Sequence, residues 1–192
     1  MLIFLLGLGI FFVAHFYSAI RSRAPGNDIK ERMGYGPYMG LYSLVSIFGF
    51  VLICYGYGLT RGMGLIYSPP VWTKHINLLL MLPAMILLVA SQVPAGRIKK
   101  AAKHPMLLAV KIWALGHLLA NGEINAVILF GSFLAYAVFD RIMVKKRGDN
   151  GPSPDVALNP LMDVVAIVGG LIAYAALAFW LHPILFGVQV IG

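Results

Sequence analysis

His104–Glu123, which reads HPMLLAVKIWALGHLLANGE, is the stretch from which the rest of the chain is best interpreted. It is apolar enough to enter a membrane, yet it contains His104, Lys111 and His117 within about four helical turns. An ionisable side chain at membrane depth costs at least about 2.5 kcal/mol, so such residues usually have a function. The stretch therefore predicts a transmembrane helix that contributes to a site, surrounded by a scaffold of other apolar segments.

The composition is that of an integral membrane protein with one domain, residues 1–192. Of these 192 residues, 60% are hydrophobic and 11% are charged, whereas soluble domains have roughly 25% charged residues. The net charge of +8 does not indicate a nucleic-acid partner, because the basic residues are divided among short clusters and no nucleic-acid-binding motif accompanies them. The single cysteine, Cys54, excludes an intramolecular disulfide.

Six apolar segments predict an all-α membrane helix bundle with six transmembrane helices. Each segment has about 16–22 residues, which matches a hydrocarbon core of about 30 Å. The first is interpreted as a retained span, because it lacks the basic n-region of a signal peptide and its apolar run is too long. The predicted spans are Leu2–Ile20, Tyr38–Leu59, His75–Val93, Pro105–Ala120, Ile124–Met143 and Pro160–Leu181.

The basic residues predict the orientation of this bundle. Twelve of the fifteen Lys and Arg residues follow the first, third or fifth span, whereas the opposite side has only Arg61 and Lys74. Because Lys and Arg accumulate in cytoplasmic loops, both termini are expected outside the cytoplasm. The twelve residues are Arg21, Arg23, Lys30, Arg32, Arg97, Lys99, Lys100, Lys103, Arg141, Lys145, Lys146 and Arg147.

Five histidines are the main candidates for chemistry. His75, His104 and His182 lie at predicted span ends, where bonding to water or headgroups explains them. His15 and His117 lie inside apolar segments, and a bond to a carbonyl or hydroxyl explains either one taken singly. As a pair on two spans they equally indicate a shared ligand, because imidazoles from facing helices serve as axial ligands of haem iron.

His15 and His117 are expected at different depths. His15 lies slightly to the cytoplasmic side of the middle of its span and His117 lies toward the outer end of its own, a difference of roughly 10 Å. Ligation of one iron by both places the two backbones on the order of 12 Å apart. The pair is therefore compatible with one iron along an oblique axis, and a single axial histidine is the alternative.

The fourth span is expected to have two polar faces. Lys111 is seven residues from His104 and shares its face, whereas His117 lies about 120–140° away, on the side of Trp113 and Asn121. Asn121 is interpreted either as part of a plain turn or as a residue near the cofactor.

Charged residues near the inner surface have two interpretations each. Lys111 either extends to the inner membrane surface or faces an anion, such as a haem propionate, Asp140 or Asp163. Arg21 and Arg23 follow His15 by one to two turns and either anchor the helix at headgroups or pair with propionates. Zinc is not expected because no close ligand cluster occurs in the sequence.

These residues resemble the signature of the NnrU family. His104–Leu108 and Trp113–Glu123 carry most of the resemblance, and His15–Arg21 and Glu31–Arg32 extend it over nearly the whole chain. The family is associated with bacterial nitrite and nitric oxide reduction. It also includes the 15-cis-zeta-carotene isomerase of plants and cyanobacteria, a haem b protein whose activity depends on the redox state of the iron.

The resemblance implies a haem b protein of the bacterial inner membrane, with His15 and His117 at the positions of the isomerase's iron ligands. His104, Lys111, Asn121 and Arg21 are expected around the cofactor. The implied activity is a haem-dependent redox reaction or cis–trans isomerisation, in nitrite and nitric oxide metabolism or on a lipophilic, carotenoid-like substrate. Expected partners are membrane lipids and a lipophilic small molecule. The sequence does not determine whether the protein is an enzyme or an oligomer.

Two other interpretations come from different functional classes. The His-Pro sequence on a membrane helix also resembles isoprenylcysteine and phospholipid methyltransferases, where it helps form an S-adenosylmethionine site. Those enzymes have paired acidic residues after the next span, whereas Phe139–Arg147 contains only Asp140. A non-enzymatic membrane assembly or transport factor is the third interpretation.

Overall fold

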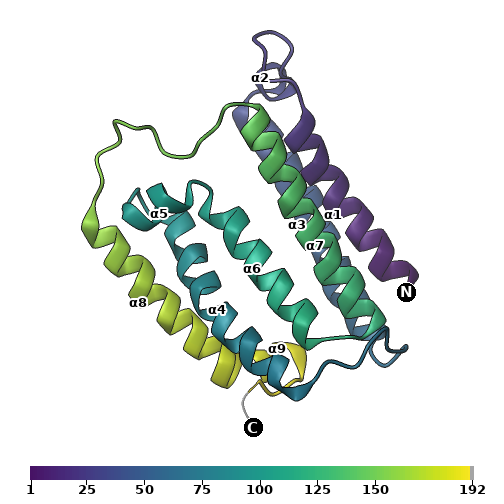
Figure 1. The fold of residues 1–192 in the computed structure, drawn as a ribbon. Helices are drawn as coiled ribbons and strands as arrows, with labels where there is room; N and C mark the ends of the chain where they lie inside the picture. Colours follow the sequence, from purple (N-terminus) through teal and green to yellow (C-terminus); the bar gives the residue numbers. More distant parts are fainter. Residues whose placement is uncertain (191–192) are drawn as a thin grey trace.

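Six apolar helices of the computed structural model run side by side between two ends of the molecule (Figure 1). The structure describes residues 1–190. The six are α1 (Leu2–Ile20), α3 (Tyr35–Leu59), α4 (Val71–Gln92), α6 (Pro105–Ala120), α7 (Ile124–Lys146) and α8 (Pro160–Ala176). Within the described residues the only β-pairing is an isolated bridge between Leu65 and Glu123.

Short helices lie at both ends of the long ones. The segments α2 (Ile29–Met33) and α5 (Arg97–Ala102) lie in basic connectors at one end, and α8 continues through the π-helical turn η1 (Leu177–Leu181) into α9 (His182–Phe186) at the other. The first residue of α1 and the helix α9 lie at the same end of the molecule, opposite α2 and α5 (Figure 1).

Five segments are long and apolar enough to cross a membrane: α1, α3, α4, α7 and the continuous helix Pro160–Phe186. The remaining apolar helix, α6, has 16 residues and is shorter than those five. The all-α fold with several apolar helices is thus confirmed. The bounds of α1 and α6 coincide with the predicted spans, whereas α3 and α4 begin three and four residues earlier and α7 ends three residues later.

Local chemistry explains where these helices begin. Pro105 and Pro160 occupy the first turns of α6 and α8, where a missing N–H costs nothing. The side chain of Asn159 caps α8 by accepting from the backbone N–H of Leu161 at 3.0 Å. The predicted second span began after Pro37, but the same rule lets Pro37 lie inside the first turn of α3.

The helices form a row of neighbours with α7 at its centre. On one side α7 packs against α1, which packs against α3; on the other side it packs against α6, which packs against α4 and through α4 is linked to α8 (Figure 1). This arrangement matters for function because His15 is on α1 and His117 is on α6, so α7 is the element that both histidine-bearing helices share.

Small residues allow α1 and α3 to pack closely. A Cβ added at Gly56 would lie 2.5 Å from the Phe4 backbone, and one added at Gly49 would lie 2.7 Å from the backbone nitrogen of Phe11. Backbone contact at such distances is possible only without a side chain. Gly49 and Gly56 therefore allow the close approach of the two helices, whereas Gly40 has open space around it.

Candidate functional site

His15 lies on α1 among aromatic rings. Its Nδ1 is 2.7 Å from the carbonyl oxygen of Phe11, one turn earlier, and its ring stacks on that of Phe11 with centroids 3.9 Å apart. Tyr42 of α3 and Tyr136 of α7 lie beside it, with centroids at 5.2 Å and 5.6 Å. A carbonyl only accepts, so Nδ1 must donate, which leaves the lone pair on Nε2. No hydrogen bond within residues 1–190 uses that Nε2.

His117 lies on α6 in an equivalent arrangement. Its Nδ1 is 2.9 Å from the carbonyl oxygen of Trp113, again four residues earlier, so Nδ1 donates and Nε2 keeps its lone pair. The ring stacks on Phe130 of α7, with centroids 4.6 Å apart and planes inclined at 26°. Both histidines predicted from sequence therefore have a tautomer that suits coordination through Nε2.

The contacts of the two histidines with α7 show how far apart they lie along the helix axis. Tyr136 lies beside His15 and Phe130 lies beside His117. Six residues separate these two contacts, which corresponds to about 9 Å along the helix axis. This agrees with the offset of roughly 10 Å expected from sequence, so the two imidazoles do not face each other at one level.

Phe133 of α7 lies between the two histidine environments. Its ring centroid is 5.5 Å from that of Phe11 and 5.5 Å from that of Trp113. Since Phe11 stacks on His15, and Trp113 lies 5.4 Å from His117, aromatic rings form a continuous path from one histidine to the other. The side chains between the two histidines are thus apolar and polarisable, and their flat faces are of the kind that pack against a planar aromatic ligand.

Lys111 does not pair with either acid considered from the sequence. Asp140 lies 3.9 Å from Arg147, and the Asp163 carboxylate accepts from backbone N–H groups at the start of α5, 2.9 Å each. Within residues 1–190, Lys111 has neither a hydrogen bond nor an ion pair, and the positive charge of Arg141 is close enough to act on it.

His104 belongs to the opposite end of α6 from His117. Its Nε2 lies 3.1 Å from the carbonyl oxygen of Asp149 and 3.6 Å from its carboxylate, in the loop that follows α7. Thirteen residues separate the two histidines on α6, or about 20 Å along the axis. The structure therefore places His104 at the basic end of the molecule and does not bring it to His117.

The side chain of Asn121 bonds to the backbone at the end of α6, where His117 lies. Its side-chain amide donates to the carbonyl of His117 at 2.9 Å. The hydroxyl of Tyr67 donates to the carbonyl oxygens of Leu118 and Asn121, so the carbonyls of His117 and Leu118 in the last turn of α6 both have partners. A Cβ at Gly122 would collide with the carbonyl oxygen of Tyr67. The Asn-Gly sequence thus ends α6 and fixes the loop over its outer end.

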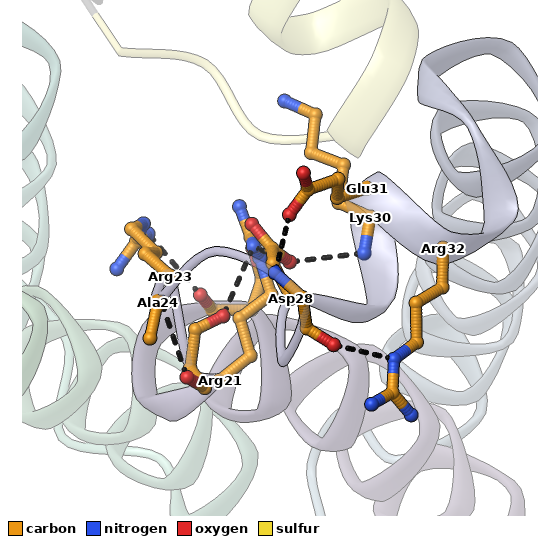
Figure 2. A network of polar contacts seen from close by, with 10 residues as sticks. Arg21, Arg23, Ala24, Asp28, Lys30, Glu31 and Arg32 are labelled. Atoms are coloured by element: carbon orange, nitrogen blue, oxygen red, sulfur yellow. Dashed lines mark hydrogen bonds and ion pairs between the residues drawn. The ribbon is translucent and has the colours of Figure 1, made fainter.

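Arg21 anchors the connector after α1. It forms an ion pair with Asp28 (Figure 2). Its guanidinium also lies over the ring of Tyr38, 5.4 Å from the ring centroid. The bond from Arg21 holds the pKa of Asp28 below its ordinary value. In the same network Glu31 accepts from the backbone N–H of Gly26 at 3.0 Å. The structure thus places Arg21 in a network within the connector of residues 21–34. Arg21 follows His15 by six residues, or about 1.7 helical turns.

Residues on α7 complete the site and were not predicted from sequence. Phe130, Phe133 and Tyr136 contact the histidines or lie between their environments, and Arg141 lies near Lys111. Phe133 and Arg141 follow Phe130 by three and eleven residues, which places these three side chains near one face of a helix. The signal was missed for Arg141 because it lies two residues before the end of the predicted span and was counted among the basic residues that predict the orientation.

Comparison with known proteins adds one match. No curated protein and no solved structure matches the chain. The family model described as NnrU protein matches residues 3–190, which is nearly the whole chain. The matched range contains nearly all residues of the apolar helices and both half-buried histidines, His15 and His117. This membrane-type helical protein therefore belongs to the NnrU family.

Proposed function

We propose that this protein binds haem b within the membrane and uses His15 and His117 as axial ligands of the iron. The observation that carries the proposal is the bond from each Nδ1 to the carbonyl four residues earlier. Such a bond fixes the ring orientation and leaves Nε2 for the metal, as partners of iron-bound and zinc-bound histidines do.

The surrounding residues fit this cofactor. The walls supplied by Phe11, Trp113 and Phe133 are aromatic, and a porphyrin has a flat aromatic face. The offset of about 9 Å between the two histidine levels requires a ligand axis inclined to the helices. Haem supplies redox and ligand-exchange chemistry, while this chain's residues set the axial ligands, the polarity and the access.

The proposed reaction is a redox step in nitrite and nitric oxide metabolism or a redox-dependent isomerisation of a lipophilic, carotenoid-like substrate. The aromatic lining favours uncharged substrates, because a charged group loses its hydration there without gaining a partner. We place the protein in the bacterial inner membrane with six spans, α6 included, and with the basic connectors in the cytoplasm. The position of α9 at the same end as the first residue of α1 supports an even number of spans.

An absorption spectrum of the protein purified after expression with haem supply tests the proposal. We expect a Soret band and the spectrum of a six-coordinate low-spin iron. The His15→Ala and His117→Ala variants should each lose the six-coordinate spectrum, and the double variant should lose haem. The control is His75→Ala, an exposed histidine at the start of α4, which should leave the spectrum unchanged. A wild-type protein without a Soret band would refute haem binding, and binding of S-adenosylmethionine would then favour the methyltransferase interpretation.

A further inference from the structure

We infer that Lys111 of α6 and Arg141 of α7 form an anion site inside the membrane that holds the carboxylate groups of the haem. The inference rests on the proposed function and adds to it two residues of this chain and the part of the cofactor that they recognise. Arg141 has no role in the axial ligation and was counted in the sequence only as an orientation signal.

The two side chains lie at matching depth on neighbouring helices. Lys111 is six residues after the start of α6 at Pro105, and Arg141 is five residues before the end of α7 at Lys146. At 1.5 Å per residue both lie about 8–9 Å inside the cytoplasmic ends of their helices. Their charges are close enough to act on each other.

Arg141 extends from the face of α7 that packs against α6. Phe130 on that face contacts Trp113, with ring centroids 5.0 Å apart, and Ala126 packs with Ala114. Arg141 follows Phe130 by eleven residues, which is three helical turns, so it lies near the same stripe. Its Nη1 is inaccessible and has no hydrogen-bond partner within residues 1–190. A buried guanidinium nitrogen without a partner is costly, and an anion would remove that cost.

No acid of the chain neutralises these two cations. The chain has seven acidic residues, and five of them form a hydrogen bond or an ion pair with another group of the protein. Of the remaining two, Glu123 precedes α7 at the outer end, and Asp155 lies exposed in the loop before α8 without an ion pair to either cation within residues 1–190. The five and their partners are Asp28 with Arg21, Glu31 with Gly26, Asp140 with Arg147, Asp149 with His104, and Asp163 with the start of α5.

The position relative to the histidines identifies the anion. Arg141 follows Tyr136, the neighbour of His15, by five residues, or about 8 Å toward the basic end of the bundle. Lys111 precedes His117 by six residues on α6, which places it about 9 Å from His117 along the axis toward the same basic end. A haem bound by both histidines has one polar edge with two carboxylates, and the two cations lie where that edge can be received. Arginine pairs with carboxylate through two parallel hydrogen bonds, which gives the site orientation as well as charge.

The test compares haem with its dimethyl ester, which keeps the iron and the ring but has no carboxylates. Protein expressed without haem supply is titrated with each in a neutral detergent, and binding is followed at the Soret band. Wild type should prefer haem by about tenfold or more, since hydrogen bonds between charged groups contribute about 1.5–3 kcal/mol. Arg141→Gln and Lys111→Gln should each reduce the preference, and the double variant should abolish it. Arg141→Lys should retain part of it, and Lys145→Gln, an exposed change on the same helix, should retain all of it.

The outcomes separate this inference from the proposed function. If wild type shows the six-coordinate spectrum but no preference, or if the glutamine variants keep the full preference, the anion site is refuted and axial ligation stands. If anionic phospholipid vesicles abolish the wild-type preference, lipid phosphate occupies the site and the inference is refuted. If wild type gives no axial-ligand spectrum, the proposed function fails. The anion site is then tested separately by titrating wild type and the Arg141→Gln variant with metal-free protoporphyrin and following its fluorescence. Weaker binding to the Arg141→Gln variant would support a carboxylate site, and equal binding would refute it.

Discussion

The rings of His117 and Phe130 are stacked across the interface of α6 and α7, with centroids 4.6 Å apart. Phe130 is 6% exposed, and its ring belongs to a buried cluster with Ala114 and Ala126. We expect Phe130→Ala to lower the free energy of unfolding by about 3 kcal/mol through lost packing. Thermal unfolding in detergent measures the change. The control is Phe179→Ala, at a side chain 55% exposed on η1, and equal midpoints for the two variants would contradict the assigned packing.

The glycines of α3 provide a matched pair one helical turn from its end. Gly56→Ala places a Cβ 2.5 Å from the Phe4 backbone, whereas Gly58→Ala meets nothing within 4 Å. We expect the first change to destabilise the protein by about 1–3 kcal/mol, because α1 and α3 must separate. The second should stabilise it by up to about 1 kcal/mol through helix propensity. Unfolding midpoints measured side by side check the difference, and loss of stability in both variants would argue against close packing as the cause.

The hydroxyl of Tyr67 closes the outer end of α6 by donating to the carbonyls of Leu118 and Asn121. Tyr67→Phe removes these bonds, and we expect a loss of about 1 kcal/mol in the free energy of unfolding. Tyr55→Phe, at an exposed tyrosine of α3, serves as the control and should have little effect.

The same residue predicts an alkaline limit. Desolvation raises the pKa of Tyr67 above its ordinary value of 10.0. A raised pKa in the folded state means that the stabilisation by the protonated Tyr67 hydroxyl is complete below pH 10. This stabilisation is lost as the pH rises through the folded-state pKa. Wild type should therefore lose stability above pH 10 more steeply than Tyr67→Phe. Parallel curves for the two proteins in chemical denaturation across this range would contradict the prediction.

The ion pair of Arg21 and Asp28 predicts an acid limit. The bond from Arg21 lowers the pKa of Asp28 from its ordinary value of 3.8. A lowered pKa in the folded state means that the pair stabilises the protein above pH 3.8 and that this contribution is lost as the pH falls through the lower folded-state value. Asp28→Asn keeps the cap of α2 but removes the charge, so its unfolding midpoint should depend less on pH between about 2 and 5. Asp155→Asn, in an exposed loop, should behave as wild type.

Most of the fold could be predicted from the sequence because a membrane imposes length and polarity on each helix. The bounds of α1 and α6 were predicted to the residue. The short helices α2 and α5 were not predicted, since their polar residues resemble those of a loop. The ends of α3, α4 and α7 extend beyond the apolar runs because helix hydrogen bonding continues into the interface, where polarity no longer marks a boundary.

The candidate site could be predicted only as far as its histidines. His15 and His117 are distinctive because an imidazole inside an apolar run is rare. Their shared neighbour α7 depends on which helices pack together, and the order of spans along a chain does not determine that. The role of Arg141 was hidden for the same reason, since a basic residue near a helix end resembles every other orientation signal.

The row of helices also implies an order of assembly during synthesis. As the chain leaves the ribosome, α1 and α3 can pair at once, and so can α4 and α6, because each pair is consecutive among the long helices. His15 and His117 then belong to two separate hairpins. They acquire a common neighbour only when α7 enters the membrane, since α7 packs against both α1 and α6. The site is therefore completed late in biogenesis, and a chain arrested before residue 124 would hold both histidines without the helix that brings them together.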